Sequence, residues 1–500
     1  MTRVHTDSTI RWLSRTILPP GNLASLRRAI AGTPHGVMLE SVAQDRTFGR
    51  FSIYAWDAVR IITTVEESER NIFGILRDQL CPAASFDSPP ELPFVGGWIG
   101  YLAYECGGWI EPTARHNPSY VSRFPMARWM LVDTVVVFDR LRNAWHVAGV
   151  ELPARLRPAA RPPLADRLDV AESFVANSDV DDRCEHAPVP DSFPSVRAMV
   201  HPAGQWAYSQ ESYFERVRRV LEYIRAGDVF QVNLARGYQA PVAEAPIAVY
   251  ERLCCRNPSI YAAYLSVGPD MPGAAILSSS PELFLSLRGR RVMTRPIKGT
   301  RPRGGDADAD RLAAEELSGC VKDRAELNMI IDLERNDLGR VCEYGSVRVL
   351  DDGCIERHPT VLHRTASITG ILRPEANAID LLRATFPGGS ITGAPKVRAM
   401  QIINELEPGP RGPYCGAIGY LGLDGDLQLN LAIRTLTIAD QVAELFVGSG
   451  LVADSVPEEE LAELEAKAAG MLAALSVDVR VTQTAAAMPV ALIPVEAPNG

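Results

Sequence analysis

Between residues 414 and 450 the sequence alternates short apolar runs with turn signals: YCGAIGYLGLDGDLQLNLAIRTLTIADQVAELFVGSG. Asp424 and Gly425 stand between two of these runs. An Asp-Gly pair favours a two-residue hairpin turn, because such a turn needs residues that tolerate positive φ. Strands joined by tight turns run antiparallel. This stretch therefore predicts an antiparallel β-meander, and a chain that contains it has to build a sheet.

Apolar periodicity and turn signals predict the other elements. In SYFERVRRVLEYIRAGD (212–228), Ser212 and Glu215 have capping-box spacing, the apolar residues share one helical face, and Gly227 follows the last turn. This segment is therefore expected to be a helix. The other expected helices lie at 307–338 and 457–475, and the other expected strands lie at 128–140, at 229–238 and on both sides of a tight turn near Gly289.

Composition divides the chain into four parts. Residues 151–168 are rich in proline and arginine, and residues 177–196 hold few large apolar side chains, which is typical of a linker. The end of the chain is rich in Ala, Val and Pro. We therefore expect an N-terminal subdomain at 1–150, a linker at 151–205, a main domain at 206–476 and a loose tail at 477–500.

Charge and apolar content exclude several classes of protein. The net charge of −10 offers no basic face for a nucleic-acid backbone. No run of about 18 apolar residues exists, so no membrane span is expected. The nine cysteines are odd in number and lack a C-x-x-C pair. Together with an N-terminus that has no signal-peptide pattern, this predicts a reduced, cytoplasmic protein.

One short segment, TRPIKGTRPRG (294–304), carries four cations. A lysine amine is a nucleophile only when it is uncharged, and neighbouring cations lower its pKa. Arg295, Arg301 and Arg303 are therefore expected to help neutralise Lys298. The alternative is that all four side chains are exposed and bind solvent or an anion.

Two predicted helices carry acidic pairs at i, i+3 spacing. Asp323 and Glu326 form one pair, Glu460 and Glu463 form the other, and Lys467 follows one turn after Glu463. Carboxylates from two helices could meet on a Mg²⁺ ion, which takes a few carboxylates together with water and an anionic substrate. The alternative is that both pairs lie on solvated helix faces.

Two glycine-rich segments could present backbone amides to an anion. In FPGGSITGAPKVRAMQIINEL (386–406), Thr392 could cap a helix and Pro395 suits its first turn. In VGSG (447–450), the amides could face a carboxylate. The alternative for each segment is an ordinary turn. Neither segment has the spacing of a Walker loop.

Five motifs occur together and in a fixed order: RPIKGTRPRG, DLERNDLGR, FPGGSITGAPK, AIRTL and GSGLVADS. With them the chain resembles the chorismate-utilising enzymes, which include anthranilate synthase component I, aminodeoxychorismate synthase component I, isochorismate synthase and salicylate synthase. The likeness is dense from about 206 to 476, the chorismate-binding catalytic domain, and thinner over 1–150. It implies an α+β fold in which two stacked, largely antiparallel sheets carry helices on the outside.

The resemblance also assigns expected roles. Glu326 and Glu463 match the ligands of Mg²⁺, and Asp323 and Glu460 match neighbours that act through water. Glu282 matches a general acid for the C4 hydroxyl, and His363 matches a histidine beside the ring of chorismate. The residues that match substrate contacts are Thr300, Tyr414, Arg434, Gly448, Gly450 and Lys467.

Three positions bear on the branch of the family. Gln231 stands where the isochorismate and salicylate enzymes have a lysine base that activates water, so ammonia is the expected nucleophile. Lys298 stands where aminodeoxychorismate synthases have a lysine and anthranilate synthases have an alanine. Asn233 points the same way. The resemblance thus implies amination of chorismate at C4, with Lys298 adding covalently at C2, and 4-amino-4-deoxychorismate as the precursor of 4-aminobenzoate and folate. The alternatives are anthranilate synthase component I, in tryptophan biosynthesis, and a non-catalytic regulatory subunit.

The resemblance further implies partners. Ammonia is expected from a separate glutamine amidotransferase subunit, since the chain has no G-x-C-x-G elbow. A separate lyase is expected to release 4-aminobenzoate. Glu40 and Ser41, in MLES, resemble part of the tryptophan pocket of feedback-inhibited anthranilate synthases. The alternative is that they simply end a strand.

Overall fold

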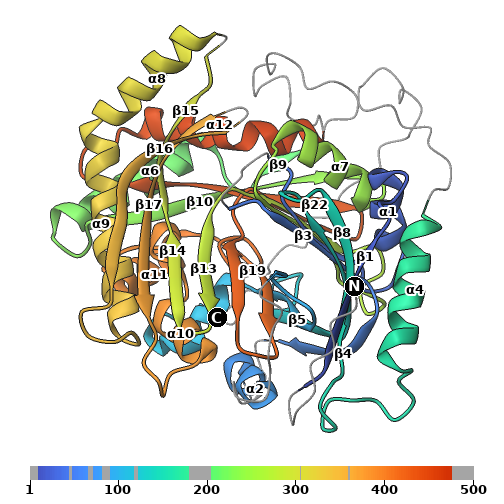
Figure 1. Ribbon diagram of the computed structural model, residues 1–500. Coiled ribbons are helices and arrows are strands. Elements are labelled where there is room, and N and C mark those ends of the chain that lie inside the picture. The colour runs from blue at the N-terminus through green and yellow to red at the C-terminus, as the bar shows by residue number, and fades with distance from the viewer. Residues whose placement is uncertain are drawn as a thin grey trace, which may run out of the picture.

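A computed structural model of the 500-residue chain shows two large sheets with helices packed around them (Figure 1). The structure describes residues 10–43, 48–65, 71–80, 91–116, 122–178, 204–304, 306–358 and 361–475. The tail predicted at 477–500 lies outside these residues. Within the described part of the chain, no helix is both long and apolar enough to cross a membrane.

The first sheet joins strands from both halves of the chain. In spatial order it contains β1 (Trp12–Ile17), β8 (Ala144–Val150), β7 (Thr134–Asp139), β3 (Phe51–Ala55), β2 (Val37–Glu40), β11 (Tyr261–Ser266), β12 (Ala275–Ser280), β21 (Thr435–Ala439), β22 (Val442–Leu451), β10 (Gln231–Pro241) and β18 (Gly393–Ala394), with β9 (Gln205–Trp206) beside β10.

The second sheet is built in the same way. Its order is β15 (Ile297–Pro302), β17 (Val361–Ile371), β14 (Arg291–Arg295), β13 (Leu283–Arg288), β20 (Leu427–Leu431), β19 (Ala417–Gly422), β5 (Gly97–Leu102), β6 (Ala127–Val132) and β4 (Ala58–Thr64), with β16 (Arg348–Arg357) beside β17. The strand pairs of both sheets are antiparallel, for example β10 with β22 and β16 with β17. The α+β fold with two antiparallel sheets is therefore confirmed.

Helices surround the two sheets. The helices are α1 (Leu23–Ala31), α2 (Ile72–Gln79), α3 (Gly107–Ile110), α4 (Leu164–Ala176), α6 (Gln210–Arg225), α7 (Pro246–Arg256), α8 (Ala307–Gly319), α9 (Val321–Gly339), α10 (Ala378–Thr385), α11 (Lys396–Leu406) and α12 (Pro457–Leu475), with short 3-10 turns at Tyr104–Cys106, Pro112–Ala114 and Gly389–Ile391. Figure 1 shows α8 and α9 along one side of the molecule and α4 on the opposite side.

The predicted meander is confirmed, and it crosses between the sheets. β19 and β20 form the hairpin around Asp424 and Gly425, where Gly425 has φ +90° and the Gly422 N–H donates to the Asp426 carbonyl at 2.7 Å. β21 and β22 then continue in the other sheet. The hairpin predicted near Gly289 joins β13 and β14, and Gly289 has φ +57°.

The strand predicted at 128–140 is two strands that belong to different sheets. β6 lies in the second sheet and β7 in the first, and the change occurs at Asp133. Asp133 is completely buried and accepts bonds from Arg161 at 2.6 and 2.8 Å and from Arg167 at 2.6 Å. The continuous β-rich sequence gives no sign of the change at Asp133, because the sheet that each strand joins is decided by strands far away in the chain.

Asp133→Ala should destabilise the protein by about 3–5 kcal/mol, because it leaves two largely buried arginines without their carboxylate. Asp169→Ala is the matched control, since Asp169 is 63% exposed in its 2.6 Å ion pair with Arg15 and should cost less than about 1 kcal/mol. Urea unfolding of both variants measures the difference. Equal losses of stability would show that the Asp133 pairs do not hold the crossing together.

The segment predicted as a linker is partly helical. α4 lies inside 151–205, and it packs on β8 through Leu164 and Leu168, which also contact Gly149. In the described part of this segment, residues 151–178, Arg161 and Arg167 bind the buried Asp133. The parts 1–150 and 206–476 also share both sheets, so they build one core.

Helix ends differ from the predictions where a nearby side chain takes over. α6 begins at Gln210, two residues before Ser212, because the Ser209 hydroxyl accepts the Ser212 N–H at 3.2 Å and caps the helix. The helix predicted at 307–338 is two helices, α8 and α9, which are separated at Cys320. The helix predicted at 457–475 is confirmed as α12.

Candidate active site

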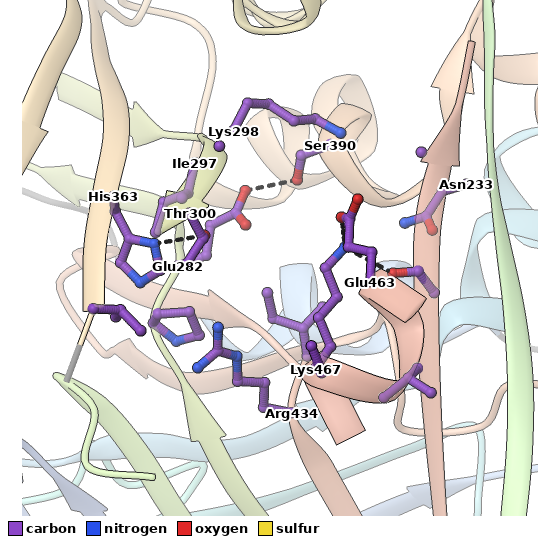
Figure 2. Close-up of a pocket in the computed structure, with 18 of the residues that line it drawn as sticks. Asn233, Glu282, Ile297, Lys298, Thr300, His363, Ser390, Arg434, Glu463 and Lys467 are labelled. Atoms are coloured by element: carbon purple, nitrogen blue, oxygen red, sulfur yellow. Dashed lines mark hydrogen bonds and ion pairs between the residues drawn. The ribbon is translucent and has the colours of Figure 1, made fainter. Parts of the chain in front are cut away.

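A cavity of about 670 Å³ lies where the two sheets and the helices α9 and α12 meet. All the residues predicted for catalysis, substrate contact and metal binding line it. They are Glu282, Lys298, Thr300, Asp323, Glu326, His363, Tyr414, Arg434, Gly448, Gly450, Glu460, Glu463 and Lys467. Figure 2 shows Glu282, Lys298, Thr300 and His363 on one side of the cavity and Asn233, Glu463 and Lys467 on the other. Residues from distant segments are thus brought together in one site.

Lys298 reaches into this cavity from β15. Its amine lies next to Gly450, where an added Cβ would stand 3.1 Å from Lys298 Nζ and 2.9 Å from Gln231 Nε2. Burial lowers the pKa of the Lys298 amine, the carboxylate of Glu326 opposes this, and the ammonium of Lys467 adds to the lowering. The amine is therefore uncharged over a wider pH range than a free lysine.

The neighbouring arginines do not explain this pKa, contrary to the sequence prediction. Arg295 is paired with Glu356, and Arg303 is paired with Asp310. Arg301 pairs with Glu316 at 2.9 Å and with Asp323 at 3.3 Å. Each guanidinium is paired with a carboxylate, and the opposite charge of this carboxylate largely cancels the effect of the guanidinium on the Lys298 amine. The sequence showed the cations but not the acids that fold against them.

Gly299 lets the Lys298 strand approach α9. Gly299 has φ +83°, and an added Cβ would stand 2.8 Å from Leu317 Cδ1 and 2.9 Å from Asp323 Cγ. A side chain at this position would be both strained and in collision. The glycine therefore brings the acidic start of α9 to the same side of the cavity as Lys298.

The lysines of this chain are concentrated around the cavity. The sequence has only four lysines among its 51 cationic residues. Lys298, Lys322 and Lys467 line the cavity, and Lys396 pairs with Asp337 on α9. Arginine cannot be deprotonated in proteins, whereas lysine can lose its proton when buried. Three of the four lysines therefore stand in the cavity, beside arginines such as Arg301 and Arg434 whose charge is fixed.

Glu282 is a buried acid on the cavity wall. It follows β12, is 4% exposed, and accepts a bond from Ser390 Oγ at 2.6 Å. Burial raises the pKa of Glu282 to about 7, although the Ser390 hydroxyl and the Lys298 amine oppose this. The group can therefore carry a proton near neutral pH.

His363 and Arg434 add two further polar side chains to the cavity lining. His363 Nδ1 lies 2.9 Å from Thr300 Oγ1, and burial with the nearby Arg434 holds the pKa of His363 well below its usual range. The imidazole is therefore neutral. Arg434 has φ +49°, an uncommon backbone conformation for a residue with a side chain, and its guanidinium donates to Asn257 Oδ1 at 3.0 Å.

Carboxylates from α9 and α12 face one another across the cavity. Burial raises the pKa of Glu326, and the carboxylates of Glu463 and Asp323 add to this. Burial acts to raise the pKa of Glu463 as well, but Lys467, 2.7 Å away, brings that pKa below its usual range. Glu460 is 2% exposed, and its Oε2 has no hydrogen-bond partner among the described residues.

This donor set fits a Mg²⁺ ion that keeps part of its water. In the described part of the chain, no three His, Cys, Asp or Glu side chains stand close enough to hold a metal by themselves. Mg²⁺ is commonly bound by one or two carboxylates, water and an anionic substrate rather than by a full protein cage. Glu326 and Glu463 offer two such carboxylates from facing helices. The unpartnered oxygen of Glu460 can bind a coordinated water.

The two glycine-rich segments take different forms: one contains the short 3-10 turn Gly389–Ile391, and the other is part of a strand rather than a turn. Residues 447–450 continue β22, where a Cβ at Gly448 would stand 2.7 Å from Asn233 Oδ1 and 3.0 Å from the Tyr414 hydroxyl. Thr392 does not cap a helix, because its hydroxyl donates to the Gly388 carbonyl at 2.9 Å and α11 begins after Pro395. The glycines instead let the backbone line the cavity closely.

Further residues line the cavity besides those predicted for the site. Among the polar ones are Asn257, Lys322 and Ser390, to which the sequence assigned no role, and Asn233, which it used only to choose the branch of the family. Lys322 Nζ lies 3.5 Å from Glu460 Oε1 at the start of α9. Ser390 lies inside the FPGGSITGAPK motif, so this motif carried the signal. Its hydroxyl could not be matched to Glu282 without the fold, since they are 108 positions apart.

Glu40 and Ser41 lie away from this cavity. Glu40 ends β2, and its carboxylate is held by Arg27 at 3.0 and 3.1 Å and by the hydroxyls of Tyr54 and Tyr250 at 2.8 Å each. The small cavity beside Glu40 measures about 50 Å³ and has room for only a few water molecules. Glu40 is the last residue of β2, and a tryptophan pocket at Glu40 and Ser41 stays a prediction.

A cavity of this size that gathers acids, lysines and an arginine defines a site for a small polar molecule. The model of the chorismate binding enzyme family matches residues 37–473. Anthranilate synthase component 1 of Thermus thermophilus is 38% identical over 452 residues, which cover 88% of this chain and 92% of that one. Aminodeoxychorismate synthase component 1 of Bacillus subtilis is 35% identical over 463 residues, with 88% and 92% covered.

A solved structure agrees with these sequence matches. The crystal structure of anthranilate synthase component I from Streptococcus pneumoniae TIGR4 superposes with a TM-score of 0.70 at 30% identity, covering 86% of this chain and 93% of that one. The chain belongs to the chorismate-binding enzyme family. It is a chorismate-utilising enzyme.

Proposed function

We propose that this enzyme aminates chorismate at C4 and releases 4-amino-4-deoxychorismate. The single observation that carries the proposal is the Lys298 amine, which lies in the cavity beside Gly450 with a lowered pKa. An uncharged amine fixed next to the ring adds to it without the entropy cost of a bimolecular encounter. The product is a precursor of 4-aminobenzoate.

Lys298 and Glu282 share the first step. The uncharged lysine nitrogen forms a bond to C2, both conjugated ring double bonds shift towards C4, and the C4 hydroxyl leaves as water with the proton of Glu282. Ammonia then forms a bond to C4, the two double bonds shift back, and the lysine nitrogen leaves C2 as the free amine. The new ammonium group at C4 returns a proton to Glu282. Glu282 suits the acid role because its pKa of about 7 lets it hold a proton at neutral pH.

The other cavity residues orient the substrate. Arg434 and Tyr414 would bind its carboxylates, together with the β22 backbone at Gly448 and Gly450. The neutral His363, held by Thr300, lies along the ring.

Glu326 and Glu463, with Asp323 and Glu460 acting through water, would hold Mg²⁺. The ion, when bound, neutralises a substrate carboxylate. Lys467, bonded to Glu463 and to the Gly448 carbonyl at 3.1 Å, links the acidic helix to the β22 backbone.

Ammonia is the expected nucleophile in place of water. Gln231 is fully buried beside Lys298, and neither polar atom of its side chain has a partner in the described residues. A glutamine cannot take a proton from water, so no base for hydroxylation stands at this position. We infer that a separate glutamine amidotransferase subunit supplies the ammonia, and that a separate lyase converts the product into 4-aminobenzoate.

Anthranilate synthesis is the second candidate. It is favoured by the relatives, most of which are named anthranilate synthase component 1, including the one at 38% identity. It is opposed by Lys298, because amination at C2 needs no covalent adduct at that carbon. The two candidates therefore differ in the ring position of the new nitrogen.

Product analysis separates these two functions. The enzyme is incubated with chorismate, Mg²⁺ and ammonium, and the products are identified by mass and chromatography before and after addition of an aminodeoxychorismate lyase. C4 amination gives 4-amino-4-deoxychorismate and then 4-aminobenzoate. Anthranilate as the sole product would refute the proposal, and no turnover under these conditions would favour a non-catalytic subunit.

The activity should decline above about pH 7. Glu282 has a raised pKa, so its proton is present below about pH 7 and is lost as the pH rises through that value. Replacement by glutamine in Glu282→Gln should lower kcat by about 10²–10⁴-fold and remove this alkaline limb. The measurement is kcat/KM against pH.

Glu105→Gln is the control for this pH profile. Burial raises the pKa of Glu105 to about 7 as well, but its carboxylate accepts the backbone N–H groups of Arg411 and Gly412 outside the cavity lining. The alkaline limb should stay in place in this variant. An unchanged limb in Glu282→Gln would instead assign the titration to another group.

A further inference from the structure

A second buried acid lies behind Glu282. Glu334 belongs to α9, is 3% exposed and stands outside the cavity lining. Its Oε1 accepts the Gly389 N–H at 3.1 Å, and its Oε2 has no hydrogen-bond partner in the described residues. Burying a carboxyl group is costly, and the proposed reaction gives this one no direct task.

The bond from Glu334 ends on the turn that carries Ser390. Gly389, Ser390 and Ile391 form one short 3-10 turn, and the Ser390 hydroxyl donates to Glu282 at 2.6 Å. A Cβ at Gly389 would stand 2.6 Å from Leu333 Cδ2 and 3.1 Å from Glu334 Oε1, so glycine is needed for α9 and the turn to approach. Glu334 is therefore linked to Glu282 indirectly, through the Gly389 N–H and the hydroxyl of the next residue, Ser390.

We propose that Glu334 is a positioning residue for Glu282: its carboxyl oxygen fixes the turn 389–391 through the Gly389 N–H and thereby holds the Ser390 hydroxyl on Glu282. The inference rests on the proposed function in so far as Glu282 is the acid of that reaction. The placement of the Ser390 hydroxyl itself does not depend on which carbon is aminated.

Glu334 can affect Glu282 through its charge as well as through its hydrogen bond to Gly389, and the two effects have to be distinguished. Burial raises the pKa of Glu334 to about 7, Asp337 on the same helix adds to this, and Lys396 on α11 opposes it. Lys396 is paired with Asp337 and also donates to the Thr385 carbonyl at 2.6 Å. Glu282 is close enough to contribute as well.

Glu282 faces further groups besides Glu334, namely Lys298 on β15 and Lys467 on α12. A variant that removes the charge of Glu334 therefore changes the pKa of Glu282 even if the turn 389–391 keeps its structure. Only variants of equal charge test the hydrogen bond to Gly389.

The test compares Glu334→Gln with Glu334→Met, because both are neutral and only glutamine offers a carbonyl oxygen to the Gly389 N–H. The titration of Glu282 is followed in the substrate-free full-length enzyme by the infrared carboxyl band, as the difference from the same variant carrying Glu282→Gln. Ser390→Ala should raise the Glu282 midpoint by about 0.5–1 pH unit, since it removes one bond to the carboxylate. The Glu282 midpoint in Glu334→Met should be higher than the midpoint in Glu334→Gln by a similar amount.

The combination with Ser390→Ala decides the matter. If Glu334 acts through Ser390, Ser390→Ala raises the midpoint in the Glu334→Gln protein and adds nothing in the Glu334→Met protein. Equal midpoints in the two neutral variants, or equal effects of Ser390→Ala in both, would overturn the proposal. Asp332→Asn, on the exposed side of the same helix with a side chain 75% exposed, is the control and should leave the midpoint unchanged.

A second pair covers the case in which Glu334→Met does not fold, as judged by circular dichroism. Glu334→Asp keeps the charge and withdraws the carboxylate from Gly389 by one methylene, so its Glu282 midpoint should lie above that of the native protein. An unchanged midpoint overturns the proposal. Since no substrate is present, these results stand whether the enzyme makes 4-amino-4-deoxychorismate or anthranilate, and product analysis tests the function separately.

Discussion

Lys298→Ala should lose the formation of 4-amino-4-deoxychorismate by about 10³-fold or more, because the intramolecular attack at C2 disappears. The variant keeps the cavity, the acids and Gln231, and it matches anthranilate synthases at this position. Part of the remaining turnover is therefore expected as anthranilate. The measurement is the rate of each product under saturating ammonium and Mg²⁺, with chromatographic separation.

Lys298→Arg distinguishes a nucleophile from a charge. Arginine keeps the positive charge at this position but is not deprotonated in proteins, so it cannot add to the ring. Both variants should therefore lose C4 amination to the same extent. Unchanged kinetics in Lys298→Ala, or full activity in Lys298→Arg, would remove the covalent role from this residue.

Glu326→Gln and Glu463→Gln should each lower Mg²⁺-dependent turnover by about 10³-fold or more, because each removes a charged donor where several kcal/mol of charge stabilisation are expected. The amide keeps the size of the side chain, so folding should be preserved. Turnover is measured against Mg²⁺ concentration, and binding of Mn²⁺ is followed by electron paramagnetic resonance in the absence of substrate.

Glu459→Gln is the matched control for the metal prediction. Glu459 lies next to Glu460 on α12 but is exposed, so its loss changes the helix charge without touching the cavity. Native turnover and Mn²⁺ binding are expected. A normal Mg²⁺ response in either Glu326→Gln or Glu463→Gln would show that the two helices do not hold the ion.

Elements that depend on short-range spacing in the sequence were the most predictable part of this protein. α12 and the β19–β20 hairpin depend on residues a few positions apart, which the sequence contains in full. The sheet change at Asp133 and the helix α4 were missed, since each depends on Arg161 and Arg167 folding back onto a distant acid. The same limit applies to Ser390, whose partner lies more than a hundred residues away.

By itself the sequence determined a set of residues that gather in one place, because whole motifs carry them and every residue predicted for catalysis, substrate contact and metal binding lines the same cavity. Only the tertiary structure decided why Lys298 has a lowered pKa. Its neighbours in the chain are arginines that turn to Glu316, Glu356 and Asp310. What lowers the pKa of its amine is first of all burial, and the charged groups that act on the amine lie on α9, on α12 and at Glu282. Electrostatic energy depends on distance in space and on exposure to water, and neither is written in the order of the residues.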